Sequence, residues 1–293
     1  MNSEIQINIR ERLHSKSKKI TDPAGREIEI LEDAQASKVA EECNSTLHSI
    51  YIEALTVGVC PYRYLRNREA VSPQEQLGLA KSRVAVIGAG GLGGQIILLL
   101  ARMGIGTLVV VDHDVFDETN LNRQALSSME TLGKPKSEAA AATVRSINPG
   151  VKVIPFQVKL DGSNAPQILA GADVAVDALD NVKDRFVLER EAKKLGIPLV
   201  HGALAGFEGQ IMTIFPGDPG LKHLYRNEGA GGDKSKRPES ILGVPTLTPS
   251  LIATIEAMEV IKIILKRDKI FRNTMVHVDL ETGQMNTFSL KKA

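Results

Sequence analysis

Apolar runs and amphipathic stretches alternate along residues 83–200 and predict strands separated by helices. The runs at residues 83–88 and 107–112 are almost continuously apolar, which is typical of strands buried on both faces. Further strand-like runs, at residues 151–158, 174–177 and 198–203, are separated by helical patterns. Strands alternating with helices of this length indicate βαβ units, and hence an α/β fold with a Rossmann-like, doubly wound and mainly parallel sheet.

The pattern changes after residue 203. A strand-like stretch at residues 209–215 is followed by a long loop at residues 217–245, rich in Gly, Pro and Lys. A strongly amphipathic helix is predicted at residues 249–266, and two antiparallel strands at residues 275–278 and 285–290 close the chain. Loops of this length inside a compact domain are usually functional.

Residues 1–60 form a predicted extension of different texture. Ile5, Ile7 and Ile9 alternate with polar residues, and Ile28 and Ile30 do so after a turn signal at residues 22–25. This pattern predicts two half-exposed strands in a hairpin. Apolar positions at helical spacing predict one helix within residues 31–57. We expect a small α+β extension ahead of a main domain at residues 61–293.

Composition excludes several classes of protein. The 36 Lys and Arg residues balance 35 Asp and Glu residues, so no overall charge favours nucleic acid or an anionic membrane. Aromatic residues make up 4% and Trp is absent, which disfavours base stacking on aromatic side chains. Two cysteines, Cys43 and Cys60, are too few for a disulfide scaffold. The sequence shows no signal-peptide or membrane-span pattern, so we expect a cytoplasmic protein.

A glycine loop joins the first buried strand to the next helix. Gly88, Gly90 and Gly93 have the spacing that lets backbone amides approach a phosphate at a helix N-terminus. Asp112 ends the second strand, where a partner of the ribose hydroxyls is expected. Taken alone, this pattern also fits an NAD-dependent oxidoreductase, or a turn that only packs a helix on a strand.

The residues after Asp112 favour a triphosphate. Asn120, Arg123, Gln124 and Lys136 follow strand ends or lie in their loops, at the edge where ligands bind in such sheets. Two cations facing phosphates have little use in hydride transfer, but they suit the neutralisation of a triphosphate during attack.

Five motifs follow one another in order: GAGGLG at residues 88–93, D-x-D-x5-N-L-x-R-Q at 112–124, G-x-P-K at 133–136, D-x-x-D-N at 177–181 and E-G-Q at 208–210. With these motifs, residues 66–290 resemble the ThiF/MoeB/HesA family of adenylating enzymes, relatives of the adenylation domain of ubiquitin-activating enzymes. The resemblance implies an adenylyltransferase that uses ATP and Mg²⁺.

The resemblance also implies residue roles. ATP phosphate and ribose would contact the loop at Gly88, Gly90, Gly91 and Gly93, and Asp112 would bind the ribose. The phosphates would contact Asn120, Arg123, Gln124 and Lys136, while Asp180 would bind Mg²⁺ and Asn181 would flank the adenine. The segment at residues 63–67 is similar to the family's R-Y-x-R-Q, so Arg66 would reach the γ-phosphate of a partner subunit in a homodimer.

The chain departs from its relatives at two places. Many of them hold zinc with two C-x-x-C pairs, but no cysteine follows Cys60 here, so a Cys₄ site is impossible and we expect no zinc. The crossover loop at about residues 217–245 also lacks the cysteine with which relatives form a thioester or persulfide. The reaction should therefore stop at the acyl adenylate.

The expected substrate is the C-terminal glycine of a ubiquitin-like sulfur carrier with a Gly-Gly tail. A peptide or tRNA-linked carboxylate is an alternative, as is a catalytically silent protein that retains the fold. His201 and His223 are expected to be structural or solvated rather than ligands.

Overall fold

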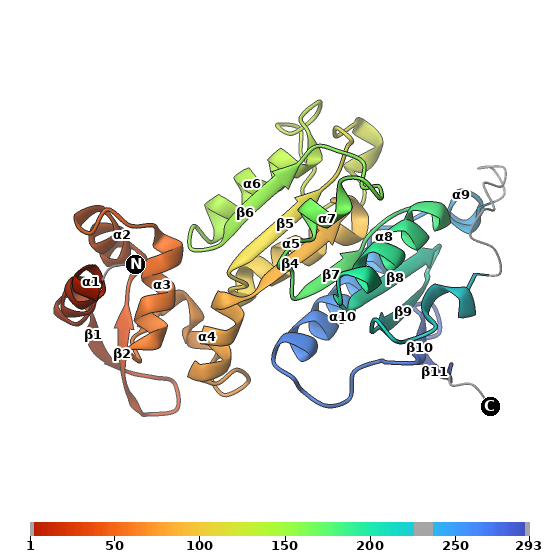
Figure 1. Ribbon diagram of the computed structural model, residues 1–293. Helices are drawn as coiled ribbons and strands as arrows, with labels where there is room; N and C mark the ends of the chain where they lie inside the picture. Colours follow the sequence, from red (N-terminus) through yellow and green to blue (C-terminus); the bar gives the residue numbers. More distant parts are fainter. Residues whose placement is uncertain (1–2, 226–236, 291–293) are drawn as a thin grey trace.

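The computed structural model describes residues 3–225 and 237–290, and its centre is an eight-stranded sheet (Figure 1). The strand order is β11-β10-β9-β8-β7-β4-β5-β6. The parallel strands are β4 Arg83–Ile87, β5 Thr107–Val111, β6 Lys152–Phe156, β7 Val174–Asp177 and β8 Leu199–Ala205; the antiparallel ones are β9 Glu208–Ile214, β10 Thr274–Asp279 and β11 Gln284–Ser289. The predicted fold, including the antiparallel C-terminal strands, is confirmed.

Successive strand residues point to opposite faces of the sheet, and both faces are covered. Val84 and Val86 belong to the core under α5 Gly91–Met103, α6 Lys136–Ile147 and α10 Leu247–Ile264. Ala85 and Ile87 belong to the core under α7 Ala165–Ile168 and α8 Val182–Lys194. This double burial explains why the strands are apolar throughout.

Strand order reverses between β4 and β7, which are neighbours in the sheet. The chain winds outward from β4 to β5 and β6 on one side, and from β7 to β8 on the other. In open α/β sheets, ligands bind in the crevice at the carboxyl ends of such a pair. Ile87 and Asp177 are paired at these ends, so the glycine loop and the D-x-x-D-N motif emerge side by side.

The predicted strand at Ile5, Ile7 and Ile9 is wrong, because this segment forms helix α1 Ser3–Lys16. Ile9 and Leu13 are four residues apart, and both are fully buried with residues of the following two helices. Helical spacing therefore gives α1 a buried face that alternation over residues 5–9 does not reveal. The hairpin exists, but β1 Lys18–Thr21 pairs with β2 Glu27–Leu31.

The single helix predicted within residues 31–57 is two helices, α2 Asp33–Glu42 and α3 Leu47–Thr56. Asn44 has φ of 45°, in the left-handed region that ends helices, and the Thr46 side chain then caps α3 by accepting from the Ser49 N–H. A short strand, β3 Cys60–Pro61, extends the small sheet beside β2.

The extension and the 3₁₀ helix that follows it, η1 Tyr62–Asn67, both pack on the ends of α5 and α6. The Tyr64 hydroxyl accepts from Asn148 Nδ2 at 2.9 Å, and His48 Nδ1 lies 3.1 Å from the Gly150 carbonyl. Helix α3 also packs against α4 Pro73–Lys81. The domain division at residue 60 stays a prediction, since contacts cross it.

The C-terminal third contains the predicted crossover segment. It includes η3 Gly220–His223 and α9 Pro238–Leu242, while residues 226–236 lie outside the described part of the chain. The predicted helix at residues 249–266 corresponds to α10, and β10 and β11 pair as predicted. Among the described helices, none combines the length and apolar character needed to cross a bilayer.

Candidate active site

The glycine loop between β4 and α5 contains glycines of two kinds. Gly88 has φ of +100°, and a Cβ there would lie 2.4 Å from the Ala178 carbonyl oxygen. A Cβ on Gly93 would lie 1.8 Å from the Gly88 carbonyl oxygen, so the fold itself requires both glycines. A Cβ on Gly90 or Gly91 would meet its nearest described atoms at 3.7 and 3.5 Å, which is ordinary contact. The protein's own packing does not require glycine at these two positions, which agrees with close approach by a ligand.

Asp112 anchors this loop to the end of β5. Its Oδ2 accepts from the Ala89 N–H at 2.7 Å, and its Oδ1 accepts from the Asp114 N–H at 2.8 Å. The carboxylate is buried beside the glycine loop. Asp112 therefore has a structural role in shaping the loop, whatever it contacts in a nucleotide.

Within the described part of the chain, the side chain of Gln124 has an unsatisfied hydrogen-bond acceptor that a ligand could bind. Its side-chain amide lies against Gly90, the residue is 7% exposed, and Oε1 is buried without a hydrogen-bond partner among the described residues. Leaving a buried acceptor unsatisfied costs about 1–3 kcal/mol, so a donor from a bound molecule is expected here. Asn120 supports Gln124 from η2 Glu118–Asn120, because its carbonyl accepts from the Gln124 N–H at 2.9 Å.

Two cations lie on the segments that follow β5. Lys136 is buried at the N-terminus of α6, and its Nζ lies 3.3 Å from Asp114 Oδ2. Half-buried Arg123 donates through Nη1 to the Thr119 carbonyl and to Asn122 Oδ1, both at 2.9 Å. Within residues 3–225 and 237–290, no carboxylate lies within ion-pair distance of Arg123, so its charge is available to an anion.

Asp180 lies just beyond the carboxyl end of β7, and its side chain is exposed. Its Oδ1 accepts from Asn181 Nδ2 at 3.2 Å. Asn181 is the N-cap of α8, because its Oδ1 accepts from the Asp184 N–H at 2.9 Å. An exposed carboxylate at the switch point is chemically suited to Mg²⁺, which prefers one or two carboxylates together with substrate phosphates.

Arg66 does not join these residues within one chain. It is exposed on η1, whose neighbouring residue Tyr64 packs against Gly104 at the C-terminal end of α5. The glycine loop is at the other end of this 13-residue helix, about 20 Å away along its axis.

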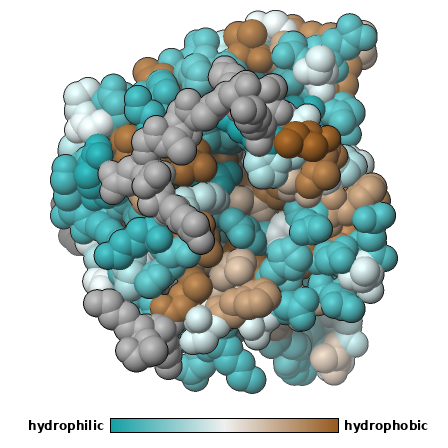
Figure 2. Space-filling view, turned by 90° about the vertical axis from the view of Figure 1, so that its right-hand side faces the viewer, coloured by the Kyte–Doolittle hydropathy of each residue, from teal (hydrophilic) through white to brown (hydrophobic). Residues whose placement is uncertain are grey.

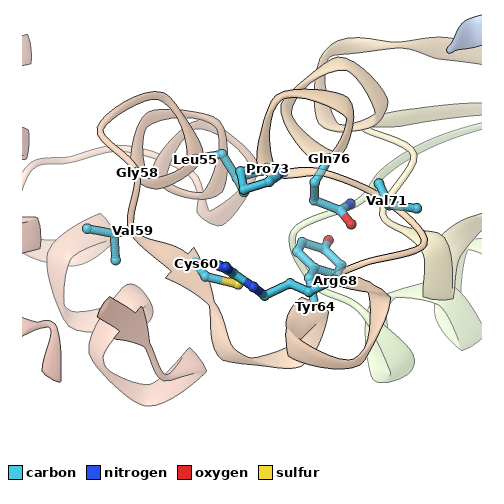
Figure 3. Close-up of a pocket in the computed structure, with 9 residues that line it drawn as sticks. All are labelled: Leu55, Gly58, Val59, Cys60, Tyr64, Arg68, Val71, Pro73 and Gln76. Carbon is cyan, nitrogen blue, oxygen red and sulfur yellow. The ribbon is translucent and has the colours of Figure 1, made fainter. Parts of the chain in front are cut away.

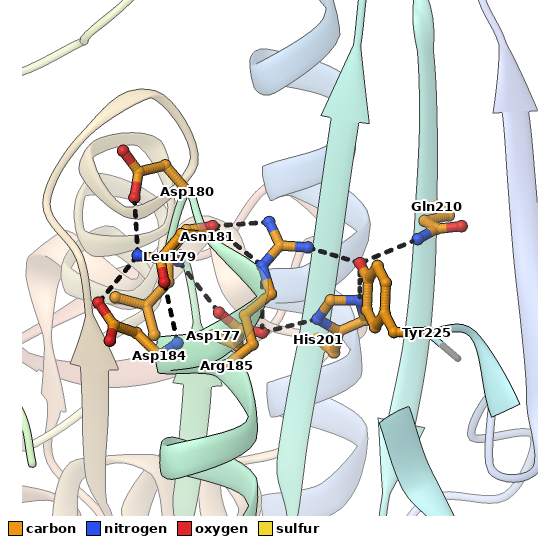
Figure 4. A network of polar contacts seen from close by, with 9 residues as sticks. All are labelled: Asp177, Leu179, Asp180, Asn181, Asp184, Arg185, His201, Gln210 and Tyr225. Carbon is orange, nitrogen blue, oxygen red and sulfur yellow. Dashed lines mark hydrogen bonds and ion pairs between the residues drawn. The ribbon is translucent and has the colours of Figure 1, made fainter. Parts of the chain in front are cut away.

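The structure also reveals a largely buried polar group that the motifs only partly indicate. It consists of Asp177, Arg185, His201, Gln210 and Tyr225, and it extends from the carboxyl end of β7, near Asp180, to Gln210 on β9 (Figure 4). Asp177 and Gln210 belong to the D-x-x-D-N and E-G-Q motifs, but Arg185 and Tyr225 have no sequence signal that marks them. His201, expected to be structural or solvated, is fully buried.

A small cavity of about 20 Å³ lies elsewhere, under the N-terminal extension (Figure 3). Cys60, Tyr64, Arg68 and Gln76 are among the side chains that line it. Burial raises the pKa of the Cys60 thiol. Since this volume holds roughly one water molecule, the cavity is no substrate site.

Figure 2 shows apolar residues at the surface on the side of the molecule that lies at the right of Figure 1, where α9, β10 and β11 are found. Phe207, Ile241, Leu242 and Leu247 are exposed near the turn between β8 and β9. The Gly206 N–H donates to the Gly243 carbonyl at 2.8 Å, which ties the end of α9 to this turn. On β11, Met285 and Phe288 are also exposed.

A Rossmann-type domain with these features at its switch point is a nucleotide-binding protein. The sequence profile of the ThiF family matches residues 64–293, and the chain belongs to this family. It is 40% identical over 220 residues to the SAMP-activating enzyme E1 of Haloferax volcanii, covering 74% of this chain and 80% of that one. It is 34% identical over 201 residues to a sulfur carrier protein adenylyltransferase of Thermus thermophilus, covering 67% and 73%.

A third relative is longer. The adenylyltransferase and sulfurtransferase MOCS3 of Arabidopsis thaliana is 35% identical over 240 residues, which cover 80% of this chain but 51% of the relative. Among solved structures, the microcin C7 biosynthetic enzyme MccB superposes with a TM-score of 0.67 over 99% of this chain and 88% of its own, at 18% identity. That likeness supports the fold alone. By its family and its named relatives, the chain is an adenylyltransferase of the ThiF/MoeB type.

Proposed function

We propose that the protein uses MgATP to adenylate the C-terminal glycine of a ubiquitin-like sulfur carrier. The main supporting observation is Gln124 Oε1 beside Gly90, which has no hydrogen-bond partner among the described residues, together with Arg123 and Lys136 on the segments that follow β5. The names of the Haloferax and Thermus relatives support a carrier protein as the substrate. A tail of two glycines suits a narrow channel, since it has no side chains.

The chemistry needs positioning and charge neutralisation rather than a protein nucleophile. A carboxylate oxygen of the carrier attacks the α-phosphorus of ATP, the bond from that phosphorus to its bridging oxygen breaks, and pyrophosphate leaves. Arg123 and Lys136 neutralise the phosphates as the charge shifts. Asp180 would hold Mg²⁺, which would supply further neutralisation of the phosphate charge. The carrier leaves as an acyl adenylate.

The adenylate is passed on without a covalent enzyme intermediate. The crossover segment contains no cysteine, and a thiolate is required for a thioester or persulfide. Cys43 and Cys60 both precede the nucleotide-binding strands, and Cys60 is buried. A sulfide donor, another protein or an amine therefore receives the acyl group.

Two chains complete each site in this proposal. Arg66 is exposed far from the glycine loop of its own chain, which fits a homodimer in which it reaches the γ-phosphate of the partner subunit. The exposed apolar residues around the β8–β9 turn are our candidate contact for the carrier's folded part. We expect neither nucleic acid nor a membrane as a partner.

The absence of zinc is a separate prediction. The segment at residues 220–226 stands where many relatives have their first C-x-x-C pair, and it contains no cysteine. We expect elemental analysis of the purified protein to find no stoichiometric zinc. One zinc ion per chain would contradict this.

The decisive experiment is ATP–pyrophosphate exchange with Mg²⁺ and a panel of ubiquitin-like proteins that end in Gly-Gly. Exchange that depends on one carrier would establish adenylation and identify the substrate. ATP binding without exchange would favour a peptide or tRNA-linked carboxylate, or a silent scaffold. Binding of a nicotinamide dinucleotide in place of ATP would favour an oxidoreductase and overturn the proposal.

A further inference from the structure

Leu179, the residue that precedes Asp180, is held by hydrogen bonds to both its backbone N–H and its carbonyl. The Leu179 N–H donates to Asp177 Oδ1 at 3.0 Å. The Leu179 carbonyl accepts from Arg185 through both Nε, at 3.2 Å, and Nη2, at 2.6 Å (Figure 4). This carbonyl shares its peptide plane with the Asp180 nitrogen. The direction in which the chain enters Asp180 is therefore fixed by two buried, charged side chains.

Arg185 is in turn held by Tyr225, forty positions later in the chain. Its Nη1 donates to the Tyr225 hydroxyl at 2.7 Å, and its guanidinium carbon lies 5.9 Å from the centre of the Tyr225 ring. Asp177 Oδ2 is 3.9 Å from Arg185 Nε and balances its charge. Because Nε and Nη2 both donate to the Leu179 carbonyl and Nη1 donates to the Tyr225 hydroxyl, the guanidinium has little freedom to move.

The Tyr225 hydroxyl is the centre of this group. It accepts from Gln210 Nε2 at 3.3 Å and lies 3.3 Å from His201 Nε2. Burial lowers the pKa of His201 and raises the pKa of Tyr225, so both side chains stay neutral. His201 Nδ1 then donates to Asp177 Oδ2 at 2.7 Å, and Nε2 accepts from Tyr225.

We propose that Arg185 and Tyr225 are positioning residues that hold Asp180 in place for Mg²⁺ and tie it to Gln210 on β9. The inference rests on the proposed function, in which Asp180 is the magnesium ligand. Groups that orient a metal ligand from behind commonly change metal affinity by about 10- to 100-fold when they are replaced. In the part of the chain that the structure describes, neither residue makes a hydrogen bond to the glycine loop, so we expect their effect to act through Asp180.

The test compares Tyr225→Phe and Arg185→Lys with Tyr51→Phe. Tyr51→Phe is the matched control, because it removes a buried phenol hydroxyl that donates to Asp33 in the N-terminal extension. Binding of ATP is measured by calorimetry as a function of Mg²⁺ concentration. We expect half-saturation to need about 3- to 10-fold more Mg²⁺ in Tyr225→Phe and about 10- to 100-fold more in Arg185→Lys. The control should match the wild type.

Amide hydrogen exchange without ligand gives a second readout. Tyr225→Phe should speed exchange in residues 178–181 relative to the wild type, while Tyr51→Phe should leave that segment unchanged. Because Tyr225→Phe removes only one oxygen atom, this variant still tests the inference if Arg185→Lys fails to fold. Wild-type magnesium dependence and wild-type exchange in Tyr225→Phe would overturn the inference while leaving the proposed function intact. A wild-type protein that binds no ATP would overturn both.

Discussion

At the scale of single residues, Arg123 and Lys136 differ in how far the protein itself depends on them. Lys136 is buried, close to Asp114 and over the Phe116 ring, so replacing it disturbs the fold as well as the charge. With the described residues, the half-buried Arg123 side chain makes two hydrogen bonds, both to neutral acceptors. Arg123 is therefore the better residue with which to separate catalysis from stability.

Replacing Arg123 by Ala should abolish most of the exchange activity at little cost in stability. Loss of an arginine that stabilises charge in phosphoryl transfer lowers rates by about a thousandfold or more. Arg145→Ala is the control, since Arg145 is an exposed arginine on α6. Both variants should unfold near the wild-type temperature in calorimetry, while only Arg123→Ala should lose exchange. A folded Arg123→Ala protein with normal turnover would rule out the assigned role.

Glu256 on α10 should make stability fall as pH rises. It is 0% exposed, and neither carboxyl oxygen has a hydrogen-bond partner among the described residues. Burial, reinforced by Asp177 and opposed by Arg185, raises its pKa well above the ordinary value. Above pH about 4.5 the unfolded chain ionises while the folded protein keeps the proton, which costs about 1.4 kcal/mol per pH unit until the folded pKa is reached.

Glu256→Gln removes this titration and keeps the shape of the side chain. Its free energy of unfolding, measured in urea between pH 5 and 8, should exceed that of the wild type by an amount that grows with pH. Glu259→Gln is the contrast, because Glu259 accepts from Thr213 and Phe271 and pairs with Lys262. That variant should be less stable than the wild type. A difference for Glu256→Gln that does not vary with pH would contradict the prediction.

At the scale of elements, the strands and helices of the nucleotide-binding part were predictable because each carries its own pattern. Double burial makes β4 and β5 apolar throughout, and the glycine loop marks where α5 begins. Alternation at Ile5, Ile7 and Ile9 misleads, because the burial of α1 depends on helices α2 and α3. Likewise, Arg185 and Tyr225 meet only after folding, so no local pattern places them behind Asp180.

Within the β4–α5 turn, Gly93→Ala and Gly90→Ala should fail in different ways. The Gly93 position has backbone 1.8 Å from an added Cβ, so the alanine variant should be strongly destabilised. The Gly90 position leaves 3.7 Å, so that variant should fold but bind ATP more weakly, since the methyl group occupies space beside Gln124. Thermal unfolding and ATP titration separate the two effects. Normal ATP affinity in folded Gly90→Ala would argue against a nucleotide at this turn.

At the scale of the whole molecule, η1, which follows the N-terminal extension, and the candidate site lie at opposite ends of α5. Tyr64 packs at the helix's C-terminal end, and the glycine loop forms its N-terminal end. For exposed Arg66 to reach phosphates bound at the glycine loop of the same chain, η1 would have to detach from its place at the end of α5. In the proposed homodimer, a second copy of the chain would supply Arg66, and closed two-fold symmetry would then give two equivalent composite sites.

Mixing two inactive variants tests this arrangement. In a heterodimer of Arg66→Ala and Arg123→Ala chains, the first chain's site has its own Arg123 and its partner's Arg66, and it is intact. The other site lacks both. Random exchange of subunits makes half of the dimers mixed, so about a quarter of the wild-type exchange activity should return. Each variant alone should be inactive, and co-purification of two differently tagged chains from the mixture checks that the subunits have exchanged. If Arg66 acts within its own chain, the mixture of the two inactive variants stays inactive.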